Sequence, residues 1–302
     1  MTPLIHVKRL EITDSMLIAS DVPETDYPAW SNSTTYALGD RVILTSTHKI
    51  YESIQAGNLN KNPAADDVAW WSEVSPTNKW KLFDTSNSTA TAKSTSFYYT
   101  LRPAQGVNAL AALNLTGANS IRIRVTHPTL GTLYDKTQAL ASLPASVGWW
   151  EWFFSTRKAP SVAIATDLPA IPGCDIRVDF EGTTALSVGV LLVGVQKSIG
   201  IAVQQGARIG ITDYSRKETN AFGDTVLVQR AYAKRASFDV PILSGDVDDV
   251  VDYLASVRAV PSLWIGSGLY GSTVVFGFYK DFEVNLAYRA VSECSISIEG
   301  MT

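Results

Sequence analysis

The sequence predicts a mainly β, multidomain protein with a small three-stranded aromatic module, a β-sandwich of jelly-roll type and an α+β unit. Short runs of β-branched and aromatic residues recur between turn residues along most of the chain, as in proteins built from sheets. Only one segment, near the C-terminus, has helical periodicity. Hydrophobic residues make up 46% of the 302 residues and charged residues 18%, which indicates an ordered chain with several cores.

The first two units are separated by the proline-containing stretch "DVPETDYPAW". Residues 1–25 contain strand-like runs without a sheet of their own, so we expect them to pair with the C-terminal unit or with a neighbouring subunit. Residues 26–79 form the aromatic module, in which Ala37, Leu38, Gly39 and Asp40 provide a turn. Its expected strands are "RVIL", "HKIYESI" and "VAWWSEV". A sheet this small has little core, so some of its aromatic residues must fill it.

Residues 80–197 form the expected β-sandwich, because many short strands at regular spacing are typical of that architecture. In "SIRIRVT" the aliphatic residues alternate with Arg122 and Arg124, which places both charges on the solvent face. The apolar run at 185–195 predicts a strand buried on both faces. The other expected strands are "TSFYYTL", "ALAALNL", "WWEWFF" and "CDIRVDFE".

Residues 198–302 form the expected α+β unit. It begins with a long hairpin over residues 206–240, whose turn lies near residues 220–224. A helix follows, capped by Ser244 or Asp246 and ended before Pro261. Its apolar stripe is formed by Val247, Val250, Val251, Leu254 and Val257.

The sequence offers almost no catalytic signal, so we expect a protein that is not an enzyme and has no metal or cofactor. The three histidines, at positions 6, 48 and 127, lie in different predicted units without partners at ligand spacing and read as surface or edge residues. Cys174 and Cys294 are expected to be buried, reduced thiols. Carboxylates near the module could pair as in glycosidases, although nothing pairs any two of Asp40, Glu52, Asp66, Asp67 and Glu73.

The partners suggested by charge are proteins and not nucleic acids. The net charge is −4, whereas nucleic-acid proteins usually carry a basic face. The basic segments "YSRKET" and "RAYAKR" on the hairpin fit a solvated surface or an interface with an acidic neighbour better. The N-terminus has no apolar run of signal-peptide length and no segment is long enough to insert into a membrane, so we expect synthesis and folding in a reducing cytoplasm.

The aromatic module resembles the small carbohydrate-binding modules of bacterial chitinases. The shared pattern is a Trp, then Tyr-x-x-Gly-Asp-x-Val, a Tyr, an Asn and a Pro, and a closing Trp. It covers about 45 residues and departs from the family where Ser53, Ile54, Gln55 and Ala56 replace the expected exposed aromatics. Trp30, Tyr36 and Tyr51 match the scaffold and favour a core role. Trp71, or Trp70 beside it, is the better candidate for an exposed ring, because neighbours in a strand point to opposite faces. The resemblance makes these five residues the candidate carbohydrate-binding site.

The arrangement of all the units resembles baseplate or tail-tip proteins of long-tailed bacteriophages, whose sheet-plus-helix unit is similar to the tail-tube fold. The resemblance implies a structural subunit at the tail tip of a virion, other tail or baseplate proteins as partners, self-association in a ring, and contact with host-surface glycans. Two alternatives stay open. One is a secreted polysaccharide-processing enzyme with an appended chitin-binding module, and the other is a phage protein whose module is only an interaction spacer.

Overall fold

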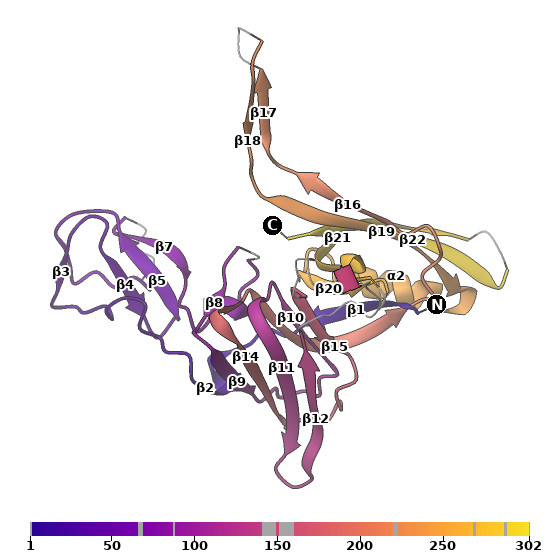
Figure 1. Ribbon diagram of the computed structural model, residues 1–302, viewed down its shortest axis with the longest axis horizontal. Helices are drawn as coiled ribbons and strands as arrows, with labels where there is room; N and C mark the ends of the chain where they lie inside the picture. Colours follow the sequence, from indigo (N-terminus) through magenta and orange to yellow (C-terminus); the bar gives the residue numbers. More distant parts are fainter. Residues whose placement is uncertain are drawn as a thin grey trace.

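The protein is mainly β, as predicted, with one long projection and a small separate module (Figure 1). The computed structural model describes residues 2–65, 69–86, 88–140, 149–150, 160–219, 223–267, 270–286 and 289–301. Every pairing between its named strands in this part of the chain is antiparallel.

The elements follow one another along the chain with few helical segments. The strands are β1 (Leu4–Arg9), β2 (Leu17–Ser20), β3 (Thr35–Tyr36), β4 (Arg41–Leu44), β5 (Lys49–Ser53), β6 (Asn58–Leu59), β7 (Trp71–Pro76), β8 (Thr91–Ala92), β9 (Ser96–Leu101), β10 (Ala109–Leu113), β11 (Thr116–His127), β12 (Gly131–Ala139), β13 (Val162–Ala165), β14 (Asp175–Val188), β15 (Val190–Ile199), β16 (Arg208–Asp213), β17 (Arg216–Thr219), β18 (Thr225–Val228), β19 (Tyr232–Leu243), β20 (Ser262–Ile265), β21 (Val274–Asn285) and β22 (Val291–Gly300). The helical elements are α2 (Val247–Ser256) and the 3-10 turns η1 (Asp14–Met16), η2 (Lys81–Phe83), η3 (Ser244–Asp246) and η4 (Gly271–Thr273).

The largest described sheet has nine strands in the order β13-β10-β15-β1-β20-β21-β22-β19-β16. Strand β15 lies inside it between β10 and β1, and both of its faces are covered. Leu191 and Val193 belong to one core, while Val190 and Leu192 belong to another. This explains why the stretch carries an unbroken apolar run and no alternation.

A six-stranded sheet, β12-β11-β14-β9-β2 with β8 on β14, packs against one end of this large sheet. Their shared core contains Phe97, Tyr99 and Phe180 from the smaller sheet, and Leu110 and Leu191 from the larger one. The two layers therefore form a sandwich, and the expected alternation of β11 is present. Its aliphatic residues are buried, while Arg122 and Arg124 face outward and pair with Asp135 and Asp179.

The predicted helix is α2, and it covers the other end of the large sheet. Val250 and Leu254 of its apolar stripe are buried against Phe238 and Ile296 of the sheet. Strand β1 joins this end through β20, whereas β2 pairs with β9 of the smaller sheet. The N-terminal strands thus divide between the two sheets.

Several expected boundaries differ from the observed ones. The division expected between residues 197 and 198 lies inside β15, which runs from Val190 to Ile199. This strand pairs with β10 on one side and with β1 on the other, so the two expected units share one sheet. The run 185–195 is two strands that meet at Gly189, where the chain passes from one sheet to the other. A Cβ atom at Gly189 would lie 2.7 Å from the Cβ of Asn114, so glycine permits this crossing.

The prediction of a strand over "WWEWFF" is wrong at the two positions that the structure describes. Trp149 and Trp150 are helical and exposed, and residues 151–154 lie outside the described part of the chain. A run of consecutive aromatic residues lacks the alternation of apolar and polar side chains that indicates a strand with one buried face. The hairpin over 206–240 is present as β16 to β19, although residues 220–222 of its expected turn also lie outside the described residues.

Candidate functional site

The five candidate sugar-binding residues gather in one cluster that is mostly interior. Tyr36, Tyr51 and Trp71 are buried in the core of the module together with Val42, and Trp30 and Trp70 pack against them. Trp71 exposes only 4% of its surface. It meets the ring of Tyr36 edge-on with centroids 5.2 Å apart, and its indole nitrogen donates to the carbonyl of Lys61 at 2.8 Å. Most of these rings therefore fill the module.

Trp70, in the turn before β7, packs against this core without being buried in it, as Trp30 does. It is partly exposed, and the ammonium of Lys61 lies 5.5 Å from its ring centroid. Its backbone carbonyl accepts from Ile54 at 3.0 Å and from the buried side chain of Asn58 at 3.3 Å. Trp70 is thus partly exposed on a firmly held backbone, and Trp30 is the other partly exposed member of the five.

The Gly-Asp signature is explained by the turn that it builds. Gly39 has a φ of +88°, a conformation that glycine adopts without strain. The carboxylate of Asp40 accepts from the backbone nitrogen of Ala37 at 2.7 Å and closes the turn. The amide of Ser53 then donates to the Asp40 carbonyl at 2.8 Å, which ties the turn to β5.

The other carboxylates near the module are paired with cations and not with one another. Glu52 binds Arg41 at 2.7 Å, and Glu73 binds Lys49 at 2.7 Å. Asp66 and Asp67 lie outside the described residues. The described part of the module therefore contains no pair of carboxylates set for acid and base catalysis.

His48 joins the module to the rest of the chain, which the sequence did not predict. Its ring stacks on Trp80 with centroids 4.3 Å apart, and its Nδ1 lies 2.9 Å from a carboxylate oxygen of Glu24. The same carboxylate accepts from the hydroxyl of Thr77 at 2.8 Å. Since these partners lie 24 to 53 positions apart in the sequence, no local motif could have indicated them.

The most exposed element of the fold is the hairpin tip, which we call the arm and define as β17 and β18. The arm stands away from the body (Figure 1). All eight of its strand residues are exposed, and the two strands pair with each other only among the described strands. Val226, Leu227 and Val228 present three consecutive aliphatic side chains to solvent, and Leu227 is 68% exposed.

The charges of the arm are largely neutralised within it. Arg216 lies 2.6 Å from Glu218, and Lys217 lies 3.2 Å from Asp213 at its base. Hydrogen bonds from Ser215 and the contact with Lys217 lower the pKa of Asp213 to about 2. The arm is therefore an apolar and internally paired surface more than a basic one, which disfavours a role in nucleic-acid binding.

The base of the arm is held by specific contacts. The hydroxyl of Tyr214 donates to Glu299 of β22 at 2.9 Å, and this bond raises the pKa of Tyr214. The amide of Arg230 donates to the hydroxyl of Ser215 at 3.1 Å, so the two chains are clasped where the arm begins. The direction of the arm is thus set by the fold.

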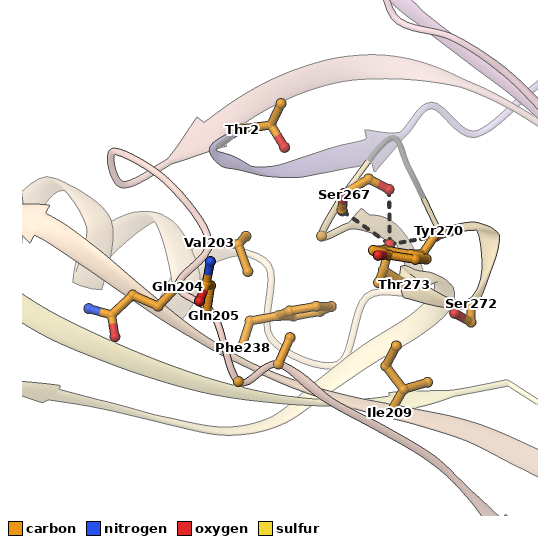
Figure 2. Close-up of a pocket in the computed structure, with 13 residues that line it drawn as sticks. Thr2, Val203, Gln204, Gln205, Ile209, Phe238, Ser267, Tyr270, Ser272 and Thr273 are labelled. Atoms are coloured by element: carbon orange, nitrogen blue, oxygen red, sulfur yellow. Dashed lines mark hydrogen bonds between the residues drawn. The ribbon is translucent and has the colours of Figure 1, made fainter.

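Two adjoining hollows are lined by residues of β16 and of its partner β19. One, the edge groove, has a volume of about 680 Å³ and is lined by residues 160–162, 209–211 and 271–272 with Tyr232 and Lys234. The second, of about 780 Å³, shares Ile209 and Ser272 with it. Figure 2 shows this second pocket, where the hydroxyl of Thr273 donates to the carbonyls of Ser267 at 2.9 Å and Tyr270 at 2.7 Å.

Catalytic groups are scarce in these hollows. Among the described residues, those lining the second pocket include no carboxylate, histidine, lysine, arginine or cysteine. Lys234 is the only charged residue among the described ones that line the edge groove. Within the described residues, no three His, Cys, Asp or Glu side chains come together as a metal site. Cys174 and Cys294 are buried free thiols. The arrangement offers apolar surface and sheet edges for binding.

No protein-family model, curated protein or solved structure was found to match this chain. In the described part of the chain, none of the helices has the length and apolar character needed to cross a bilayer.

Proposed function

We propose that this chain is a structural subunit of a phage tail tip or baseplate, which joins further copies of itself and other tail proteins through its arm. The observation that carries the proposal is the arm, an exposed two-stranded ribbon with three consecutive aliphatic residues at positions 226–228. An isolated two-stranded hairpin is at best marginally stable in water. Exposed strand edges with aliphatic side chains are surfaces that associate.

The phage assignment rests on the resemblance in domain arrangement, with a tail-tube-like unit for assembly, a jelly-roll-like sandwich and an outward module. A tape-measure gene near the coding sequence, and gold-labelled antibody bound at the tail tip of purified virions, are the expected supporting results. Labelled antibody that binds no phage particle would remove this assignment. In that event the secreted polysaccharide-processing enzyme becomes the leading alternative, with hydrolysis of chitin oligosaccharides as its direct assay.

Assembly through the arm is tested by shortening it. Residues 216–229 are replaced by Asn-Gly, a pair suited to a two-residue hairpin turn, between the clasped residues Ser215 and Arg230. Negative-stain imaging of the wild type is expected to show rings or short stacks, and the shortened protein is expected to show single particles. Rings formed equally by both proteins would contradict the proposal.

Glycan contact by the module is a separate proposal and depends on Trp70. Tyr36, Tyr51 and Trp71 are buried, and the indole nitrogen of Trp30 is buried as well. Trp70 is therefore the ring proposed to contact sugar, which needs an open ring face. A single ring would bind weakly, and a ring of copies would raise the avidity. A glycan array probed with assembled wild type and with Trp70→Ala decides the matter. Absence of binding by the wild type would leave the module as an interaction spacer.

A further inference from the structure

We infer that the arm of one copy docks in the edge groove of a second copy of this chain, where β18 adds to the free edge of β16. The inference rests on the proposed assembly function and names the surface that receives the arm. The chain carries an exposed donor strand and an exposed acceptor edge. The following observations connect them.

The first observation is the free edge of β16. Among the described strands, β16 pairs with β19 alone and ends the nine-stranded sheet. Its side chains Ile209 and Ile211 are both exposed, the latter by 57%. A free edge presents unpaired backbone N–H and C=O groups, and these accept an added strand.

The second observation is that the opposite end of the same sheet approaches this edge. Residues 160–162, at the beginning of β13, line the edge groove together with residues 209–211 of β16. β13 is the other terminal strand of the nine-stranded sheet. The sheet therefore curls so that both of its ends border one hollow of about 680 Å³. An added strand in this hollow would be covered from two sides.

The third observation is the match between the groove and the arm. The groove presents Ile209, Ile211, Tyr232 and Val162, which are apolar or aromatic, and one charged residue, Lys234. The arm presents Thr225–Val228, a segment of β-branched and aliphatic residues with high strand propensity. Its own ion pairs satisfy Arg216 and Lys217. Docking then buries apolar surface and leaves few charges to desolvate.

The donor and the acceptor of one chain do not meet. The arm points away from the body in Figure 1, and none of its eight strand residues is buried. Each copy therefore has one donor and one acceptor at different places on its surface. Such a contact is heterologous, and its repetition generates a closed ring or a stack according to the rotation between copies.

The test uses one variant of each partner surface. Leu227→Asp places a charge on the arm, and Ile211→Asp places a charge in the groove. Leu130→Asp, on an exposed residue at the β11–β12 turn, is the matched control. Each protein is first compared with the wild type by circular dichroism, and self-association is then measured by sedimentation velocity over a range of concentrations.

Wild type and Leu130→Asp are expected to form multimers. Leu227→Asp and Ile211→Asp are each expected to lose self-association by at least about tenfold, since a charge buried without a partner opposes docking. An equimolar mixture of the two defective variants is expected to form dimers and no larger species. Between them they retain one intact arm and one intact groove that can engage.

The outcomes separate the two proposals. If Leu227→Asp dissociates while Ile211→Asp assembles as the wild type does, the arm still assembles the protein, but the groove is not its receptor. A mixture that stays monomeric also overturns the inference, because the intact arm of one variant and the intact groove of the other should still pair. If Leu227→Asp assembles as the wild type does, or the wild type is a monomer throughout, both proposals fail.

A second measurement does not depend on loss of assembly. Leu227→Cys in one copy and Ile211→Cys in another place the two thiols across the proposed contact. The native Cys174 and Cys294 are buried and should not react. Mild oxidation of the mixed proteins is expected to give a disulfide-linked dimer that neither protein gives in a mixture with wild type. No dimer above that background would overturn the proposed contact.

Discussion

Acid should weaken the large sheet through one buried histidine. His6 lies on β1 and is fully buried, not at the surface or an edge as the sequence suggested. Its Nδ1 lies 2.7 Å from the hydroxyl of Tyr253 on α2, and its ring centroid is 4.3 Å from that of Trp264 on β20. Lys8, on the same strand, is the cation that acts on it. Among the described residues, no carboxylate forms an ion pair with this ring.

The sign of the effect follows from the pKa. Burial, together with the charge of Lys8, lowers the pKa of His6 from 6.5 to about 4. As the pH falls, the unfolded chain therefore binds this proton before the folded chain does. The contribution of His6 to stability is complete above about pH 6.5, decreases between about pH 6.5 and 4, and changes no further below that. A separation of about 2.5 pH units corresponds to about 3 kcal/mol.

The comparison of wild type with His6→Gln isolates this contribution, because glutamine can still bond to Tyr253 and is neutral at every pH. Urea unfolding is followed by circular dichroism from pH 7.5 to pH 4. The free energy of unfolding of the wild type should decline relative to that of His6→Gln by about 3 kcal/mol across this range. His127→Gln controls for removal of a histidine as such. Parallel curves for wild type and His6→Gln would refute the assigned role of burial.

Three further predictions concern packing and assembly. Trp71→Ala should lower the free energy of unfolding of the aromatic module by about 3 to 5 kcal/mol, measured by thermal unfolding. Trp70→Ala should lower it much less, and equal losses would contradict the assignment of Trp71 to the core. Gly266→Ala should destabilise the protein by about 1 to 3 kcal/mol in urea, because its Cβ would lie 2.3 Å from the ring of Phe238. Gly245→Ala, which meets open space, is the control, and similar losses for both would count against this packing argument. The association constant, measured by sedimentation velocity, should change by less than about threefold between about 0.1 M and 1 M salt. The proposed contact is apolar, whereas a contact made by charges would be screened by salt. Loss of assembly at high salt would favour a charged interface instead.

The elements that the sequence predicted well are those with a local pattern. The alternation of Ile121, Ile123 and Val125 places them on one face of β11. The spacing of Val250 and Leu254 places both on the buried face of α2. The hairpin β16–β19 follows from two strand-like runs around a turn. Gly39 and Asp40 build the turn that their residue types indicate. In each case the partners are near in sequence, so the pattern contains the information.

Features that depend on distant partners could not be predicted. β1 pairs with β15 and β20, about 190 and 260 positions away, and only the assembled sheet brings them together. His6 shares a strand face with Leu4, yet its burial depends on α2 and β20. Trp71 is buried although the sequence favoured it as the exposed ring, because its burial depends on the core formed with Tyr36 and Tyr51. The two hollows beside β16 likewise arise from the curl of a sheet whose ends lie far apart in the sequence.

Sedimentation equilibrium of the wild type and of the arm-shortened protein tests the central claim most directly. We predict that the wild type is a multimer whose average mass rises with concentration. The shortened protein, with Asn-Gly in place of residues 216–229, should stay at the mass of one chain. A wild type that remains a monomer at the highest concentration, or a shortened protein whose mass rises in the same way, would contradict assembly through the arm.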